Sequence, residues 1–82
     1  MSNKVNYLKK LKMRSIRRGT KEMDIILGNF SEYLKILDNE NLKKYEQLLE
    51  IDDDKIYKWI TDQEEVDHDF KDLVFEIKRK IF

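Results

Sequence analysis

Apolar residues recur at spacings of three and four along most of this chain, which is the period of α-helices that bury one face. The longest stripe predicts a helix from about Thr20 to Leu37 and consists of Met23, Ile26, Leu27, Phe30, Leu34 and Leu37. A shorter stripe with lysines around it predicts a helix over roughly residues 4–16 and consists of Val5, Leu8, Leu11 and Ile16. Proline is absent and alternation of β-branched residues is scarce, so we expect no sheet.

Three further helices are expected in the second half of the chain. Asp38 and Asn39 predict a turn and cap before a helix that carries Leu42, Tyr45, Leu48 and Leu49. The run of three aspartates at 52–54 places carboxylates at the favourable end of a short helix that carries Ile56, Trp59 and Ile60. Asp67 or Asp69 is expected to cap the last helix, whose stripe consists of Phe70, Leu73, Val74, Ile77 and Ile81.

Five short helices with tight links predict an all-α fold, a compact five-helix bundle with short connections that forms a single domain over residues 1–82. Gly28 lies inside the longest stripe and predicts a kink or a close contact there. We expect the following side chains to be mostly buried: Met23, Ile26, Leu27, Phe30, Leu49, Ile56, Trp59, Ile60, Phe70, Leu73, Val74 and Ile77.

The composition limits the compartment and the chemistry. Cysteine is absent, which excludes a disulfide scaffold, a thiolate zinc site and a cysteine nucleophile. No apolar run approaches the about 18 residues that a membrane span needs, and no hydrophobic segment follows the basic N-terminal residues as it would in a secretory signal. The sequence therefore predicts a protein of the bacterial cytoplasm that does not insert into membranes.

The charges are segregated along the chain, although the net charge is zero. Residues 1–21 contain eight basic and no acidic side chains, and residues 22–82 contain nine basic and 17 acidic ones, so the two parts carry +8 and −8. The sign changes in the run Arg17–Asp24, which contains Gly19, one of only two glycines. Such asymmetry is an argument about partners, and it predicts a surface that binds an oppositely charged one.

Residues that could carry out catalysis or bind a metal do not form a recognisable set. From Asp52 the spacing matches an EF-hand only at two positions, and Tyr57 stands where the loop needs glycine. His68, between Asp67 and Asp69, has no nucleophile or second ligand at a suggestive spacing, and two isolated glycines cannot form a phosphate-binding loop. We therefore predict no catalytic residue, no metal site and no enzyme activity of its own, with a small enzyme built on Glu22 and His68 as a rival hypothesis.

The basic first helix could also bind nucleic acid by releasing counterions from phosphates. Against this, it contains one aromatic residue, Tyr7, and the rest of the molecule would repel a polyanion. A protein partner with an acidic patch fits the charge distribution better. A generic basic-helix interaction protein or nucleic-acid-binding protein remains the alternative function.

Gly19 and Glu22 have a local explanation in the start of the second helix. If Gly19 is the N-cap, the Glu22 carboxylate falls at N3, where it can accept unpaired backbone N–H groups. This does not explain Arg17 and Arg18, which then precede the positive end of a helix dipole. Arginines in that position suggest compensation by acidic groups of a partner.

The run Arg18-Gly19-Thr20-Lys21-Glu22 resembles the Arg-Gly-x-x-Glu signature of the succinate dehydrogenase assembly factor 2 family. The flanks are similar too, with Arg14-Ser15 upstream and Asp24 downstream. A second block, Leu48-Leu49-Glu50 followed by Asp52 and Ile56-Tyr57-Lys58-Trp59-Ile60, also matches, so that the resemblance runs from about Tyr7 to Ile77. Members often have proline at the starts of the fourth and fifth helices, where this chain has Asp53-Asp54 and Val66-Asp67.

The resemblance implies a bundle that binds the flavoprotein subunit of succinate dehydrogenase and promotes covalent attachment of FAD to a histidine of that subunit. We also expect a monomer when alone and no FAD bound stably by the protein itself, with FAD handled through the partner flavoprotein. The sequence leaves open whether free FAD binds and what the oligomeric state is. Whether the flavoprotein of fumarate reductase is also a client is left open.

The resemblance also implies a role for each motif residue. Arg18 would offer two donors to a partner carboxylate or carbonyl, Gly19 would permit close backbone approach, and Glu22 would orient Arg18 or accept a hydrogen bond. Arg17 and Asp24 would contribute at the rim. We therefore expect Arg18, Gly19 and Glu22 together on the surface, with few internal contacts that explain their identity.

Overall fold

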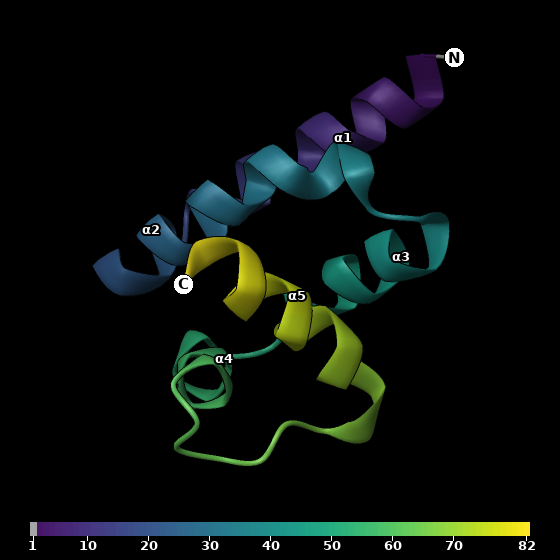
Figure 1. The fold of residues 1–82 in the computed structure, drawn as a ribbon. Coiled ribbons are helices and arrows are strands. Elements are labelled where there is room, and N and C mark those ends of the chain that lie inside the picture. Colours follow the sequence, from purple (N-terminus) through teal and green to yellow (C-terminus); the bar gives the residue numbers. More distant parts are fainter. Residues whose placement is uncertain (1) are drawn as a thin grey trace.

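The computed structural model describes residues 2–82, and within them every regular element is helical. The α-helices are α1 (Ser2–Ser15), α2 (Lys21–Phe30), α3 (Asn39–Leu48), α4 (Asp53–Ile60) and α5 (Lys71–Ile81), and two short 3₁₀ helices are η1 (Ser31–Ile36) and η2 (His68–Phe70). Figure 1 shows α5 among α2, α3 and α4, with α1 at the top of the molecule. The predicted all-α, five-helix fold is confirmed.

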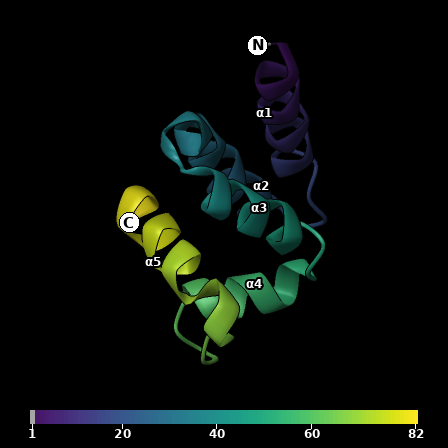
Figure 2. The same ribbon diagram turned by 90° about the vertical axis from the view of Figure 1, so that its right-hand side faces the viewer.

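The last helix closes the core. α5 packs against α2, α3 and α4, which come from different parts of the chain. α1 packs instead on α2 and η1, and its N-terminal half extends beyond the rest of the molecule (Figures 1 and 2). The first helix is therefore covered on one side only.

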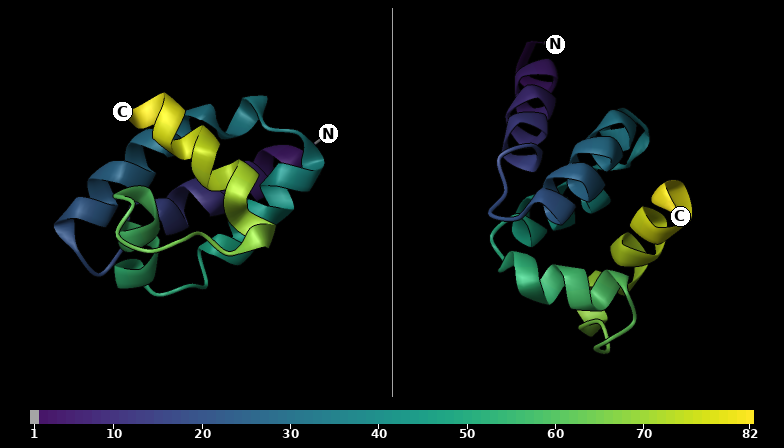
Figure 3. Two further views of the ribbon diagram at one scale, coloured as in Figure 1. Left: turned by 60° about the horizontal axis from the view of Figure 1, so that its bottom comes forward. Right: turned by 90° about the vertical axis from the view of Figure 1, so that its left-hand side faces the viewer.

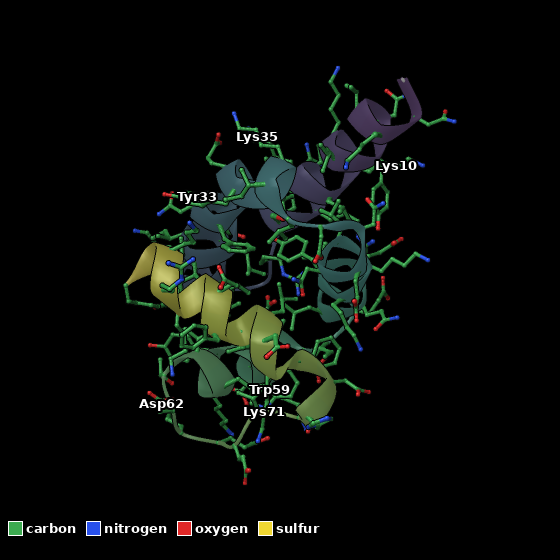
Figure 4. The ribbon with its side chains drawn as sticks, turned by 45° about the vertical axis from the view of Figure 1, so that its right-hand side comes forward. Lys10, Tyr33, Lys35, Trp59, Asp62 and Lys71 are labelled. Carbon is green, nitrogen blue, oxygen red and sulfur yellow. The ribbon has the colours of Figure 1, made fainter. Side chains whose placement is uncertain are left out.

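Eleven of the twelve side chains expected in the core are buried, and Phe70 is half-buried at its edge. There the Phe70 ring packs against Trp59, with 5.7 Å between ring centroids. Trp59 projects from α4 toward α5 (Figure 4), and no other group in residues 2–82 forms a hydrogen bond with its indole N–H. The core also includes Leu11, Leu34, Leu42, Tyr45 and Leu48.

The helix predicted from Thr20 to Leu37 is in fact two segments, because α-helical hydrogen bonding ends at Phe30 and η1 follows. Ser31 is buried at the junction, and its hydroxyl donates to the carbonyl oxygen of Gly28 at 2.6 Å. A serine that binds a nearby backbone carbonyl competes with the regular helical bond, and 3₁₀ turns are frequent at such helix ends. Leu34 stays buried in η1, so the apolar stripe survives the change.

The apolar stripe predicted for the first helix is only partly buried, and the cap expected for the last helix is wrong. Val5 and Ile16 are 52% and 50% exposed, because α1 buries only the side on which Leu11 lies. The last helix begins after η2, and neither Asp67 nor Asp69 accepts a capping hydrogen bond through its side chain. Asp38 does cap α3 as predicted, since its Oδ1 accepts from the N–H of Asn41 at 2.8 Å.

Gly28 permits the close contact that its position predicted. A Cβ atom there would lie 3.4 Å from Cγ2 of Ile16, so α1 approaches α2 at this residue.

Candidate partner-binding site

The turn between α1 and α2 carries the Arg-Gly-x-x-Glu run. Thr20, and not Gly19, is the N-cap of α2, since its hydroxyl oxygen accepts from the N–H of Met23 at 3.2 Å. Glu22 therefore occupies the second helical position instead of the third. A carboxylate so close to the N-terminus still complements the helix dipole.

Arg18 points inward, which contradicts the expectation that it lies on the surface with few internal contacts. Its guanidinium forms an ion pair with Asp53, in which both Nε and Nη2 lie 2.7 Å from Oδ1. Nη1 donates to the carbonyl of Leu49 at 3.0 Å, and Nη2 donates to that of Ile51 at 3.3 Å. The two side chains of the ion pair are only 10% and 13% exposed.

The position of this charge has a physical reason that the sequence did not reveal. Leu49 is the C-cap of α3, so the guanidinium satisfies a carbonyl at the negative end of that helix dipole. Asp53 is the first residue of α4, so its carboxylate lies at the positive end of another. Arg18 therefore interacts with α3 and α4, and compensation from a partner is not needed to account for it.

Gly19 also has an internal partner. Its N–H donates to Oδ2 of Asp53 at 2.6 Å, and a Cβ atom on Gly19 would lie 3.3 Å from the same oxygen. Its φ is not positive, so no left-handed backbone requires glycine here. Asp53 thus holds the turn with both carboxylate oxygens, one on Arg18 and one on Gly19. Sequence reasoning assigned Asp53 only a role at the helix dipole, because no local pattern pairs it with a residue 35 positions earlier.

Asp24 supports the same turn from α2. Its Oδ1 accepts from the backbone N–H of Arg18 at 2.5 Å, and the residue is half-buried. This contact explains an aspartate at this position without a partner. A rim role for Asp24 stays a prediction.

A buried polar pair lies behind the turn. The Ser15 hydroxyl donates to the carbonyl of Leu11 at 2.7 Å and lies 2.5 Å from the Tyr45 hydroxyl, and both residues are fully buried. Burial raises the pKa of Tyr45 to about 12, although the Ser15 hydrogen bond and the Arg18 charge oppose the shift. The pair joins the end of α1 to α3, and it fixes the helix that leads into the turn.

The residues left on the outside of the turn border a cleft of about 250 Å³, which is lined by Thr20, Glu22, Asp53, Asp54 and Tyr57. Glu22 is exposed, and no ion pair or side-chain hydrogen bond joins it to the rest of residues 2–82. Arg17 is exposed in the same way just before the turn. Tyr57, which the sequence assigned no role, is half-buried in the cleft wall one turn along α4 from Asp53. An internally fixed turn thus presents an open, acidic cleft.

In residues 2–82 no group of three or more metal-ligating side chains comes together. His68 is exposed in η2 and belongs to none of the clefts that border the turn. None of the helices in the same range has the length and apolar character to cross a membrane.

The fold and the cleft define a small all-helical domain with an acidic surface cleft. Residues 9–81 match the sequence model of the family described as flavinator of succinate dehydrogenase, and the chain belongs to this family. It is 33% identical over 64 residues to succinate dehydrogenase assembly factor 2, mitochondrial, of Arabidopsis thaliana. That alignment covers 77% of this chain but 34% of the plant protein, so the chain spans about a third of its relative. No solved structure matches the chain. The resemblance stated from the motif is confirmed.

Proposed function

We propose that this protein binds the flavoprotein subunit of succinate dehydrogenase and promotes the covalent attachment of FAD to that subunit. Membership of the flavinator family supports the process, and the cleft beside the motif supports the place of contact. The observation that carries the proposal is that the motif residues differ in what they contact. Arg18 and Gly19 use their polar groups on Asp53, whereas Glu22 keeps its carboxylate free beside the cleft.

This difference changes the roles of the motif residues. Glu22 contacts the flavoprotein directly, and Arg18 and Gly19 act by holding the turn against α4. The Tyr57 ring and the Thr20 hydroxyl complete the contact surface. A surface held rigid before binding loses little conformational entropy when it binds, which favours affinity.

In this proposal the protein is not the catalyst. The flavoprotein supplies the histidine that becomes linked, and its bound FAD is the other reactant. The small protein holds the flavoprotein in a conformation in which the two meet, which is catalysis by orientation in the partner's own site. It binds no FAD stably by itself, so titration of FAD with the isolated protein should leave the flavin fluorescence unchanged.

The test is flavin attachment in a co-expressed flavoprotein subunit from the same genome, followed as covalent flavin fluorescence on a denaturing gel. The wild-type protein should raise the covalent signal above that of the flavoprotein alone, and Glu22→Gln should lower it strongly. Glu40→Gln, which removes an exposed charge in the first turn of α3, is the matched control and should act as wild type. Equal signal with and without the protein would refute the function.

Gly19 gives a second test of the site. Gly19→Arg should abolish flavin attachment while the bundle stays folded, because the new side chain meets Asp53 and projects over the cleft. Gly19→Ala should retain much of the activity, since its Cβ meets only the end of a side chain at 3.3 Å. Circular dichroism melts of both variants separate loss of binding from loss of fold. Normal flavin attachment by a folded Gly19→Arg variant would show that the turn is not the interface.

A further inference from the structure

One face of α1 carries a stripe of exposed apolar and basic side chains. Val5, Lys9 and Lys12 follow one another at spacings of four and three, so they lie along one side of the helix, and Ile16 follows directly after the helix end. All four are exposed to solvent, and half or more of the Val5 and Ile16 surface is accessible. The stripe contains no carboxylate.

A matching stripe runs along α2 into η1. Lys21, Ile25, Gly28 and Glu32 have the same spacing, and Ile25 is 52% exposed. The core-facing side of α2 is a different one, which carries Met23 and Leu27 and packs toward α5. Figure 3 (right) shows α1, α2 and α5 in this order, with α5 on the far side of α2.

The two stripes lie side by side. Ile16 approaches Gly28, as described above, and Nζ of Lys12 forms an ion pair with Oε2 of Glu32 at 2.9 Å. A groove of about 270 Å³ continues the surface between α1 and η1, with Lys35 at its edge. Lys35 projects from η1 toward solvent in Figure 4. We call this combined surface the α1–α2 face.

The α1–α2 face is apolar at its centre and positively charged around it. Ile16, directly after α1, and Ile25 on α2 each leave about half of their surface exposed to solvent. Of the charged side chains on the face, only Glu32 is acidic, and Lys12 already pairs with it. Contiguous exposed apolar side chains with a polar rim are typical of protein contact surfaces.

The chemistry selects the kind of partner. Lysines around isoleucines fit a folded protein surface whose apolar side chains are surrounded by aspartate and glutamate. A nucleic acid would engage the lysines but would leave the isoleucines against charged phosphates, with no apolar burial to gain. The rest of the molecule, with its charge of −8 over residues 22–82, would also repel a polyanion.

We infer that the α1–α2 face is a second contact surface for the flavoprotein, covered by an apolar patch with an acidic rim. This rests on the proposed function. The face ends beside the turn that borders the cleft, because Arg17 directly follows Ile16 and Glu22 directly follows Lys21. The cleft is acidic and the face is basic, so one partner that covers both can bind in one orientation only.

The experiment compares two equally exposed apolar residues on different helices. Ile25→Glu places a charge in the centre of the α1–α2 face, whereas Phe75→Glu does so on α5, where the ring is 62% exposed. Binding of the purified flavoprotein subunit is measured by titration, with circular dichroism to establish that both variants are folded. Ile25→Glu should weaken binding by about tenfold or more, and Phe75→Glu should stay within about twofold of wild type.

Two charge-reversal variants test the basic rim of the α1–α2 face independently. Lys21→Glu should weaken binding several-fold and reduce its salt dependence, while Lys43→Glu, an exposed lysine on α3, should not. Equal losses from Ile25→Glu and Phe75→Glu would overturn the inference.

The outcomes separate this inference from the function on which it rests. If Glu22→Gln stops flavin attachment and Ile25→Glu binds normally, the inference is wrong and the proposed function stands. If the wild-type protein does not bind the flavoprotein at all, both are wrong. Binding of duplex DNA, of anionic lipid vesicles or of a second copy of this chain that Ile25→Glu abolishes would assign the face to that occupant instead.

Discussion

Arg18 joins three parts of the chain through one guanidinium group. It belongs to the turn after α1, donates to two carbonyls at the end of α3, and pairs with the first residue of α4. A planar group with five donors in a fixed fork suits this arrangement, and a lysine could make only part of it. At the scale of the residue, the main role of Arg18 is therefore to hold the turn, α3 and α4 together inside the molecule.

The two adjacent arginines provide a matched comparison. Arg18→Ala should lower the free energy of unfolding by on the order of 2 kcal/mol, because it leaves the Asp53 carboxylate and the Leu49 carbonyl without their donor. Arg17→Ala should change it by no more than about 0.5 kcal/mol, since Arg17 is exposed. Urea denaturation followed by circular dichroism measures both, and equal effects would contradict the internal role of Arg18.

At the scale of the element, the helix starts differ in how they satisfy their first N–H groups. Asp38 accepts a capping hydrogen bond at the start of α3, and Thr20 does so for α2. Asp52 is the N-cap of α4 but makes no capping bond through its side chain. The acidic residues in the first helical turn of α4 are Asp53 and Asp54. Asp53 accepts a hydrogen bond from Gly19 in the turn between α1 and α2.

This difference predicts unequal effects of two identical substitutions. Asp38→Ala should destabilise the fold by about 1 kcal/mol, the usual cost of losing an N-cap hydrogen bond. Asp52→Ala should cost only a few tenths of a kcal/mol, since it removes a charge near the helix dipole and no bond. Thermal melts of the two variants at one pH show which substitution destabilises the fold more. A larger loss of stability for Asp52→Ala would show that the cap assignment is wrong.

At the scale of the whole molecule, the Ser15–Tyr45 pair lies where α1, α3 and the turn meet. Tyr45 is fully buried, and its pKa is raised to about 12. The folded state therefore keeps the phenol proton above pH 10, where the unfolded chain has lost it. Stability that depends on neutral Tyr45 is complete below about pH 10 and is lost as the pH rises toward 12.

Tyr45→Phe isolates this contribution. At neutral pH the variant should be less stable by about 1 kcal/mol, because the Ser15 hydroxyl loses its partner on α3. Between pH 10 and 12 the wild-type protein should lose stability faster than the variant, so the gap between them should narrow. Urea denaturation at several pH values measures the gap. Lysine titration affects both proteins alike and cancels in the difference, and a gap that stays constant would contradict the raised pKa.

The sequence by itself determined the helices, most of the core and the family. Helical period and capping depend on residues within about four positions of one another, so the stripe from Met23 to Phe30 and the cap at Asp38 could be identified locally. The motif and the Leu-Leu-Glu block are likewise contiguous runs of residues. The expected exposure of Glu22 was correct for the same reason, since it follows from its place on a helix face outside the apolar stripe.

Only the tertiary structure decided what the motif residues contact. The partner of Arg18 and Gly19 is Asp53, 35 and 34 positions away, and that pairing exists because α3 and α4 dock their ends against the turn. Tertiary packing likewise leaves Val5 and Ile16 about half exposed, although both belong to the apolar stripe, because α2, η1 and α3 cover only the inner side of α1. A local pattern fixes which side of a helix is apolar, whereas the packing of distant helices fixes whether that side is covered and where a charge finds its partner.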